Sequence, residues 1–485
     1  MRRTKIIATL GPGTDKPDML ERVIKAGVNV VRLNFSHGSR EDHLLRASQL
    51  RETAERLGRD IAILGDLQGP KIRIDRFKDG SVTLEEGAVF ILDAALGRDD
   101  GTQERVGIAY KELPNDTDVG DILLLDDGRV VLEVTAVEGP EVRTRVQVGG
   151  ALSNNKGINR QGGGLSAAAL TDKDREDIKL AAEIGVDYLA VSFPRSAADI
   201  KLARELMIEA GGKAGIVAKI ERAEALDVID EIILASDAIM IARGDLGVEI
   251  GDEGLPAVQK ELVNKARWMN RVTITATQMM ESMIENPIPT RAEVFDVANA
   301  VMDGTDAVML SGETATGRFP DKVVQAMGRI CEAAEQQHKV THSDHRINTR
   351  FTYVDEAIAM ASMYTANHLR VKAIAALTES GSTPLWMSRI SSGIPIYAMT
   401  PNVETRRKVA LYRGVYPVTF MTHEMKSHAE ANVKVVSILE QREVVADGDL
   451  VIITKGDLMG NGGGTNAMKI VEVGNLVEPY EAGFN

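Results

Sequence analysis

Cysteine is nearly absent from this chain, and its first hydrophobic run is short. The 485 residues include a single cysteine, Cys331. One thiol excludes an internal disulfide framework and fits a reducing compartment. The first apolar run, at residues 6–10, is far too short for the hydrophobic segment of a signal peptide or for a membrane span. These absences predict a cytoplasmic protein without a membrane partner.

Positive charge is also in deficit. Lys and Arg number 57 against 71 Asp and Glu, so the formal net charge is −14. An acidic surface repels phosphate backbones, which argues against nucleic acid as a partner. Three nucleotide motifs are missing as well: G-x-x-x-x-G-K-[ST], G-x-G-x-x-G after a strand, and the H-R-D kinase loop. Nucleotide binding by those routes is therefore unsupported.

Short apolar runs are abundant instead. Eight of them are apolar on both faces, which is typical of buried parallel strands. They lie at 5–10, 28–35, 61–67, 186–193, 215–221, 238–245, 272–279 and 306–312. Helix-patterned stretches separate them at a steady spacing of about 30 residues, except that about 120 residues separate the third run from the fourth.

Eight strand–helix units at one spacing predict a TIM (β/α)8 barrel, because right-handed crossovers are the default for such units. The alternative is a doubly wound open sheet. The predicted barrel covers residues 1–69 and 166–340, interrupted once by an insertion. A chain of this length is expected to hold about three domains.

The insertion at 70–165 is predicted to be a small all-β domain, a β-barrel lid. Its apolar runs alternate with polar residues, at 81–84, 89–92, 122–125, 130–137 and 142–148. Asp-Gly pairs at 79–80 and 127–128 are typical of hairpin turns. Because it follows the third strand on the active-site face of a TIM barrel, the insertion is well placed to close over that face.

A separate C-terminal α/β regulatory domain is predicted at 346–485. Its strand-like runs lie at 373–377, 394–399, 416–420, 450–454 and 469–473, with helical patterns between them. A glycine-rich tract, GNGGG at 460–464, follows one of these strands. Such a tract is interpreted as a loop whose backbone N–H groups could close over a phosphate.

Polar residues at the carboxyl ends of the barrel strands indicate the active site, since TIM barrels place it there. The second strand ends with Arg32, Asn34 and Ser36, whose spacing points all three side chains the same way. An Arg beside neutral oxygen ligands suggests a phosphate or carboxylate clamp next to a cation site. Asp66 ends the third strand and is available to the same cation.

The fifth and sixth strands end with Lys219, Glu221 and Asp245. If these strands are neighbours, the two carboxylates can share one divalent ion, as Mg²⁺ is usually held. The structural alternative is a set of ordinary ion pairs. The seventh strand brings Thr277, which could relay a proton or could serve only as β-branched packing. The eighth brings Ser311.

The chain resembles pyruvate kinase, in its bacterial form, along essentially its whole length. The motifs that carry the resemblance are KIIATLGPG at 5–13, VVRLNFSHG at 30–38, DLQGPKIR at 66–73, AKIE at 218–221, ARGDLGVE at 242–249, ATQMMESM at 276–283 and MLSGETA at 309–315. The resemblance implies a three-domain subunit of a homotetramer that transfers phosphate from phosphoenolpyruvate to ADP. The products would be pyruvate and ATP, in the last step of glycolysis.

The resemblance also implies roles for individual residues. Lys219 matches the residue that stabilises the migrating phosphoryl group, and Glu221 and Asp245 match the ligands of Mg²⁺, for which Mn²⁺ is a possible substitute. The remaining matches are phosphoenolpyruvate contacts at Arg32, Gly244, Asp245 and Thr277, nucleotide contacts at Asn34, His37, Arg73 and Lys156, and a monovalent-cation site at Asn34, Ser36 and Asp66.

Two expectations concern regulation and monovalent ions. The sequence reads Lys71 where K⁺-dependent relatives have Glu, and it is similar to the branch that works without K⁺. An ammonium there would replace the cation, so K⁺ is not expected to be required. In the family, a loop of the C-terminal domain often binds an activating sugar phosphate or nucleotide. The matching residues here are Thr378, Ser380, Gly381, Ser382 and Thr383.

Two other functions remain as alternatives, and they differ in which of these residues they need. A Mg²⁺-dependent aldolase or lyase acting on pyruvate-like acids would use Arg32 and the carboxylate pair, but needs neither Lys219 nor Lys156. A catalytically inactive effector sensor would need none of the polar strand ends. An assay for pyruvate formation that requires phosphoenolpyruvate, ADP and Mg²⁺ together separates all three.

Overall fold

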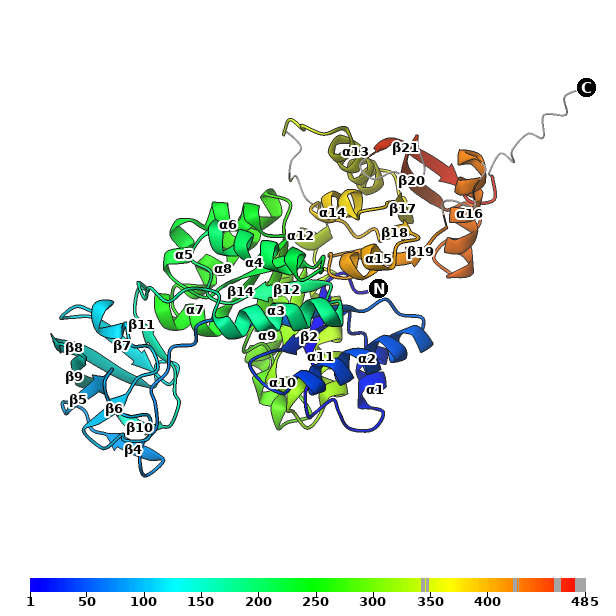
Figure 1. The fold of residues 1–485 in the computed structure, drawn as a ribbon. Helices are drawn as coiled ribbons and strands as arrows, with labels where there is room; N and C mark the ends of the chain where they lie inside the picture. The colour runs from blue at the N-terminus through cyan, green and yellow to red at the C-terminus, as the bar shows by residue number, and fades with distance from the viewer. Residues whose placement is uncertain (342–344, 346–348, 422–424, 426, 458–463, 476–485) are drawn as a thin grey trace, which may run out of the picture.

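The computed structural model describes the chain except for residues 342–344, 346–348, 422–424, 426, 458–463 and 476–485. A central barrel carries a β-rich insertion on one side and a C-terminal α/β domain on the other (Figure 1). The predicted glycine-rich tract at 460–464 lies largely outside the described residues. Within the described ranges, no helix is both long enough and apolar enough to pass through a bilayer.

Eight parallel strands close into the predicted barrel, in the order β1-β16-β15-β14-β13-β12-β3-β2. They are β1 (Lys5–Thr9), β2 (Val30–Asn34), β3 (Ala62–Asp66), β12 (Tyr188–Val191), β13 (Gly215–Ile220), β14 (Ala238–Ala242), β15 (Val272–Ala276) and β16 (Ala307–Leu310). β1 pairs with both β2 and β16, so the sheet has no free edge. The TIM barrel is confirmed, and the doubly wound open sheet is excluded.

The strands are apolar on both faces because each face lies in a core. Residues such as Ile7, Val217 and Ile274 fill the barrel interior with no exposed surface. Their strand neighbours, such as Ile6 and Ile216, pack outward against the helices and are equally buried. Each such side chain contributes about 1.5–3 kcal/mol relative to exposure. This double burial explains why the strands are visible in the sequence.

Helices surround the barrel, and several begin at capping boxes that satisfy their first backbone N–H groups. The helices are α1 (Met19–Lys25), α2 (Arg40–Arg56), α3 (Asp172–Ile184), α4 (Ala197–Glu209), α5 (Glu224–Asp227), α6 (Ile229–Ala235), α7 (Arg243–Ile250), α8 (Leu255–Trp268), the 3₁₀ turn η2 (Glu281–Ile284), α9 (Arg291–Asp303), α10 (Gly312–Ala315), α11 (Pro320–Ala334) and α12 (His338–Thr341). Capping boxes open α2 at Ser39, α3 at Thr171 and α9 at Thr290.

The insertion is all-β, as predicted, but its strands form two open sheets. Its elements are β4 (Ser81–Leu84), β5 (Val89–Asp93), β6 (Arg105–Gly107), η1 (Leu113–Asn115), β7 (Ile122–Leu125), β8 (Val130–Glu138), β9 (Glu141–Val148), β10 (Gly150–Ser153) and β11 (Ile158–Arg160). Six strands pair in the order β11-β7-β8-β9-β5-β6, and β10 pairs with β4. This arrangement differs from the closed barrel predicted for the insertion, because β4 and β10 pair only with each other.

The C-terminal domain is a separate α/β unit, as predicted. Its sheet runs β19-β18-β17-β20-β21, with β21 antiparallel at the edge. Its elements are α13 (Val354–His368), β17 (Ala373–Leu377), α14 (Ser382–Ser388), β18 (Ile396–Thr400), α15 (Val403–Val409), β19 (Val415–Thr419), α16 (His428–Gln441), β20 (Leu450–Gly456) and β21 (Thr465–Glu472). The domain lies against the amino ends of the barrel strands, where Asp306 forms a buried ion pair with Arg389.

Candidate active site

A cavity of about 150 Å³ opens at the carboxyl ends of the barrel strands. Strand β2 places Arg32 and Asn34 on one face, and its pairing with β3 sets Asn34 opposite Asp66. The cavity brings together eleven residues that the sequence pointed to: Arg32, Asn34, Ser36, His37, Lys71, Arg73, Lys219, Glu221, Asp245, Thr277 and Ser311. Barrel closure therefore gathers the predicted strand ends into a single site.

Lys219 is at the centre of a buried charge cluster. Its Nζ lies 2.9 Å from Glu221 Oε1 and 3.4 Å from Asp66 Oδ1. It also donates a hydrogen bond to Ser192 Oγ at 2.6 Å. Arg32 Nε donates to the other oxygen of Asp66 at 2.5 Å. Two cations and two carboxylates therefore neutralise one another at the floor of the cavity.

The cluster keeps Lys219 charged. Burial by itself would lower the pKa of Lys219, but the Asp66 and Glu221 carboxylates outweigh burial and raise that pKa. Burial likewise disfavours the Asp66 carboxylate, yet Lys219 and then Arg32 hold the pKa of Asp66 below its ordinary value. Lys219 therefore presents a fixed positive charge to the cavity at neutral pH.

Glu221 and Asp245 suit a divalent cation. Glu221 directly follows β13, and Asp245 lies in the first turn of α7, directly after the neighbouring β14. Burial raises the pKa of Glu221; Lys219 opposes this rise and the Asp245 charge adds to it. Glu221 Oε2 accepts one hydrogen bond, from the Phe193 amide at 2.9 Å.

The Glu221 and Asp245 carboxylates can still accept a metal ion. No hydrogen bond or ion pair joins the Asp245 carboxylate to another residue in the described part of the chain. Groups of three or more metal-ligating His, Cys, Asp or Glu side chains are absent from that same part. Two carboxylates whose coordination is completed by substrate oxygens and water are the usual protein contribution to a Mg²⁺ site. The donor set therefore fits Mg²⁺.

Thr277 occupies a strained backbone position beside the cavity. Thr277 and Gln278 have φ values of 67° and 52°, a left-handed conformation that costs a non-glycine residue about 1–3 kcal/mol. The Thr277 hydroxyl accepts a hydrogen bond from the Gly244 amide at 2.8 Å and donates to the Ala276 carbonyl at 2.6 Å. Simple β-branched packing would not require this strain, so the geometry favours a functional interpretation of Thr277.

The predicted monovalent-cation ligands lie close together on β2 and β3. Asn34 Oδ1 accepts a hydrogen bond from the Ser36 amide at 3.1 Å. Asp66 Oδ1 is buried and accepts no hydrogen bond within the described residues. This oxygen lies 3.4 Å from Lys219 Nζ, so a cation at the two neutral oxygen ligands would share it with that ammonium. The exposed Lys71 lines the same cavity.

The four predicted nucleotide residues do not all reach the cavity. Asn34, His37 and Arg73 line it, and Arg73 Nη1 donates to the Asn155 carbonyl at 2.8 Å. Lys156 is not among the lining residues, and its Nζ lies 2.7 Å from Asp126 Oδ1 within the insertion. Lys156 is thus held by a partner inside the insertion and does not line the cavity itself.

Two residues at the end of β12 belong to the site although the sequence analysis assigned them no role. Ser192 accepts from Lys219 and donates to the Leu67 carbonyl at 2.7 Å. Phe193 lines the cavity, donates its amide to Glu221 and has a φ of 54°. Ser192 was detectable as a polar residue at a strand end, the signal that identified Arg32.

The predicted effector loop follows β17 and leads into α14. The Thr378 hydroxyl accepts from the Gly381 amide at 2.9 Å, and the Ser380 and Ser382 hydroxyls lie 2.9 Å apart. Thr383 Oγ1 lies 2.9 Å from Thr465 Oγ1 on β21. Most of these hydroxyls are thus engaged within the domain. Residues 458–463 lie outside the described range.

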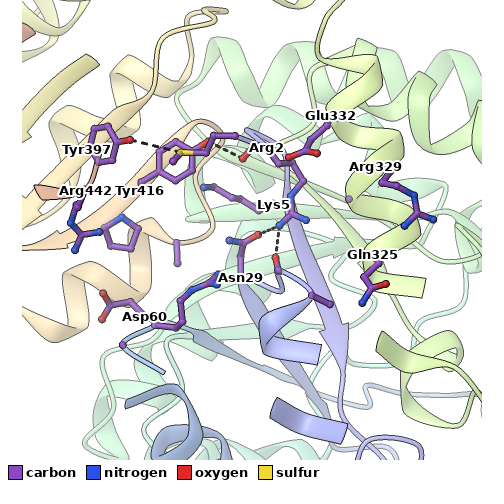
Figure 2. Close-up of a pocket in the computed structure, with 18 of the residues that line it drawn as sticks. Arg2, Lys5, Asn29, Asp60, Gln325, Arg329, Glu332, Tyr397, Tyr416 and Arg442 are labelled. Carbon is purple, nitrogen blue, oxygen red and sulfur yellow. Dashed lines mark hydrogen bonds between the residues drawn. The ribbon is translucent and has the colours of Figure 1, made fainter. Parts of the chain in front are cut away.

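A larger cavity, of about 640 Å³, lies between the barrel and the C-terminal domain (Figure 2). Among the described residues, no carboxylate lies within ion-pairing distance of three arginines at this cavity, Arg59, Arg329 and Arg442. Lys5 lies fully buried among the lining residues, donates to the Val415 carbonyl and has a pKa lowered to about 7, chiefly by burial. We name this space the interdomain cavity.

Comparison with known proteins agrees with this architecture. The family model for the pyruvate kinase barrel domain matches residues 1–324, and the model for the pyruvate kinase alpha/beta domain matches residues 356–471. Pyruvate kinase II of Salmonella typhimurium is 58% identical over 477 residues, covering 98% of this chain and 99% of the relative.

More distant relatives extend the same similarity. The pyruvate kinase of Haemophilus influenzae is 57% identical over 94% of this chain and 96% of its own length. That of Staphylococcus haemolyticus is 44% identical over 98% of this chain and 81% of its own length. With both family models matched and relatives aligned over nearly its full length, this chain belongs to the pyruvate kinase family.

Proposed function

We propose that this protein transfers the phosphoryl group of phosphoenolpyruvate to ADP, giving pyruvate and ATP. Besides family membership, one observation carries the proposal. Lys219 lies between Asp66 and Glu221 with its charge directed at a cavity that also presents Arg32 and Asp245. Phosphoryl transfer depends mainly on positioning and charge neutralisation, and this arrangement provides both.

In the transfer step, the bond between phosphorus and the enol oxygen of phosphoenolpyruvate breaks, and a bond from phosphorus to a terminal ADP oxygen forms. Arg32 would hold the substrate with the backbone at Gly244 beside it, and Lys219 would neutralise charge on the migrating group. Lys219 can do so without reorganisation because Asp66 and Glu221 already fix its position and keep it protonated.

Glu221 and Asp245 would hold Mg²⁺, with Mn²⁺ as a possible substitute. The bound ion would supply Lewis-acid stabilisation of the developing enolate oxygen. In this chain, the role of Glu221 is to offer one oxygen while its other contacts keep the side chain oriented. Asp245, which has no other described partner, would contribute the second carboxylate.

The second step is protonation of the enolate at its methylene carbon, which produces pyruvate. Thr277 is the proposed residue at this step, acting through water, with Ser311 in support; both line the cavity. The hydroxyl of Thr277 is already oriented by Gly244 and Ala276, so its oxygen has a defined position.

ADP is proposed to bind at Asn34, His37 and Arg73, with Lys156 arriving as the insertion closes. Closure would exclude water, so that ADP rather than solvent accepts the phosphoryl group. Lys156 is paired with Asp126 and does not line the cavity, so this proposal includes a closing movement of the insertion.

A coupled assay tests the function. Pyruvate should form only when phosphoenolpyruvate, ADP and Mg²⁺ are all present, with ATP formed in equal amount. Pyruvate formed without ADP, or cleavage of a carbon–carbon bond in a pyruvate-derived acid, would instead favour the aldolase or lyase. Absence of any turnover while effectors still bind would favour the sensor.

We also propose that the enzyme works without K⁺. Lys71 lines the active-site cavity, and its ammonium would supply the charge that a bound cation gives in K⁺-dependent relatives. Asn34, Ser36 and Asp66 keep a set of oxygen ligands, but a second cation near Lys71 is disfavoured by repulsion. Activity with tetramethylammonium as the only monovalent cation should therefore be near that in K⁺.

Finally, we propose activation of a cytoplasmic homotetramer by a phosphorylated metabolite. The residue pattern of the loop at 378–383 supports the C-terminal domain as the site, whereas the three arginines of the interdomain cavity offer another place for an anion. Ser382→Asp and Arg442→Glu test the two locations separately. If titrating the wild-type enzyme with fructose bisphosphate, hexose or pentose monophosphates, or AMP leaves its phosphoenolpyruvate response unchanged, the activation proposal fails.

A further inference from the structure

Arg243 connects the ends of two barrel strands to helix α9. It is the first residue of α7, directly after β14, and its side chain is only 9% exposed. The guanidinium makes two parallel contacts with Asp296 of α9, Nη1 to Oδ1 at 2.6 Å and Nη2 to Oδ2 at 2.7 Å. Such a bidentate pair fixes both the position and the plane of the guanidinium.

The same guanidinium also holds the backbone at the end of β15. Nη2 donates to the Thr277 carbonyl at 2.8 Å, and Nε lies 3.3 Å from the Ala276 carbonyl. Register pairing places Ala242 opposite Ala276, so Arg243 reaches straight across from one strand end to the next. Both carbonyls border the left-handed conformation of Thr277. Arg243 thus stabilises a backbone shape that Thr277 does not favour by itself.

A short chain of contacts leads from the Arg243 guanidinium to the hydroxyl of Thr277, which lines the active-site cavity. The Ala276 carbonyl that Arg243 approaches also accepts the Thr277 hydroxyl, at 2.6 Å. That hydroxyl accepts the Gly244 amide at 2.8 Å. The direction of the Thr277 hydroxyl and of the Gly244 N–H therefore depends on where Arg243 holds the Ala276 and Thr277 carbonyls.

Helix α9 gives the clamp a fixed anchor. A capping box between Thr290 and Glu293 opens the helix, and Glu293 also accepts the amide and hydroxyl of Ser282. Asp296 lies one turn further along the helix. Since Arg243 is almost fully removed from water, its charge requires the Asp296 carboxylate.

We propose that Arg243, held by Asp296, is a positioning residue that sets the Thr277 hydroxyl and the Gly244 amide in the geometry used by the reaction. The proposal deepens, and rests on, the proposed transfer from phosphoenolpyruvate. Neither Arg243 nor Asp296 is assigned contact with the reacting atoms. Their effect would be transmitted through Thr277.

A double-mutant cycle tests this transmission. Asp296→Asn should lower kcat/KM for phosphoenolpyruvate about 30- to 100-fold, the range expected when a reacting group is displaced by about 1 Å. The KM for ADP should change less than about twofold, because the proposed ADP contacts lie on β2 and the insertion. In a Thr277→Ala background, the same Asp296→Asn change should cost less than about threefold.

Two further variants keep the test decisive. Arg243→Lys preserves the charge but cannot bridge a carboxylate and two carbonyls. Its loss of kcat/KM should therefore also be smaller in the Thr277→Ala background than in the wild type. It replaces Asp296→Asn in the cycle if that variant does not fold. Asp187→Asn removes the partner of Arg51 on the opposite face of the barrel. It should lower the melting temperature while leaving kcat/KM within about twofold of wild type.

The outcomes separate this inference from the proposed function. Pyruvate formation by the wild-type enzyme tests the function alone. Given that activity, losses of equal factor in the wild-type and Thr277→Ala backgrounds would overturn the positioning role, as would wild-type kinetics in both Asp296→Asn and Arg243→Lys. Exchange of the pyruvate methyl protons with deuterated water gives a second readout, and it should fall in parallel with kcat/KM.

Discussion

Two buried lysines at opposite ends of the barrel strands show how differently the two faces use charge. Lys219, at the carboxyl ends, lies between two carboxylates that raise its pKa. Lys5, near the amino ends, has a pKa lowered to about 7, because burial dominates and Arg2 adds repulsion. Burial is common to both residues, so their opposite shifts come from their neighbours.

The carboxylates of the two faces differ in the same way. Asp306, beside Lys5, accepts Arg389 Nη1 at 3.0 Å, the Thr273 amide at 2.9 Å and the Arg413 amide at 3.1 Å. Asp66 pairs with Arg32 and Lys219, which both line the active-site cavity, and the Asp245 carboxylate has no hydrogen-bond or ion-pair partner among the described residues. The fully hydrogen-bonded Asp306 holds the C-terminal domain to the barrel, whereas the open carboxylate of Asp245 marks the face prepared for ligands.

The largest expected effect tests Lys219. Lys219→Met should lower phosphoryl transfer by about 10³-fold or more, because a preorganised charge at the migrating group is lost. Protonation of added enolpyruvate should survive, since Lys219 is not assigned to the methylene carbon. The coupled assay measures the first step, and enolpyruvate ketonisation measures the second.

Lys179, which pairs with Glu176 on the exposed surface of α3, provides the control. Lys179→Met should leave both steps near their wild-type rates. A wild-type rate of phosphoryl transfer in purified Lys219→Met would show that Lys219 has no role in the reaction. The functional contrast between Lys219 and Lys5 would then be wrong.

The next effect tests the opposite face. Asp306→Asn leaves the fully buried Arg389 guanidinium without its carboxylate and should lower the free energy of unfolding by about 3–5 kcal/mol. Urea unfolding followed by circular dichroism measures this loss. Glu404→Gln, at an exposed pair with Lys213, should change it by less than about 0.5 kcal/mol. Equal losses of unfolding free energy in the two variants would show that the Asp306 ion pair does not hold the C-terminal domain to the barrel.

A smaller effect concerns monovalent ions. Lys71→Glu replaces the positive charge at the cavity by a negative one, so K⁺ should become favourable beside Asn34, Ser36 and Asp66. The variant should be about tenfold more active in K⁺ than in tetramethylammonium, a difference of about 1.4 kcal/mol. The wild-type enzyme should differ little between the two salts. A hundredfold activation of the wild type by K⁺ would contradict the role given to Lys71.

The smallest effect, counted per pH unit, is the pH dependence that Lys5 adds to stability. Its pKa is about 7 in the folded protein against an ordinary value of 10.5, so the unfolded chain binds more protons between those values. Stability contributed by this group should therefore rise with pH above about 7 and stay flat below it. The free energy of unfolding should gain about 1 kcal/mol per pH unit between pH 7.5 and 9 relative to Lys5→Met. Parallel pH profiles of the two proteins would show that Lys5 is not desolvated.

Much of the barrel was predictable because its signals are local. Predicted strands at 215–221 and 272–279 correspond to β13 (Gly215–Ile220) and β15 (Val272–Ala276), whose two buried faces require consecutive apolar residues. The polar residues that end these strands were visible for the same reason. In the insertion, short strands such as β6 (Arg105–Gly107) and β10 (Gly150–Ser153) were missed, because three or four residues carry too little periodicity.

The sequence by itself determined which barrel strands form, how many there are, and which polar residues end them, since these depend on neighbours along the chain. Tertiary structure alone decided that Ser192 supports Lys219, that Asp296 anchors Arg243, and that Lys156 pairs with Asp126. These contacts join residues of different elements. Their geometry is fixed only when strand closure, helix packing and the placement of the insertion are set together, because no local pattern specifies an orientation across that distance.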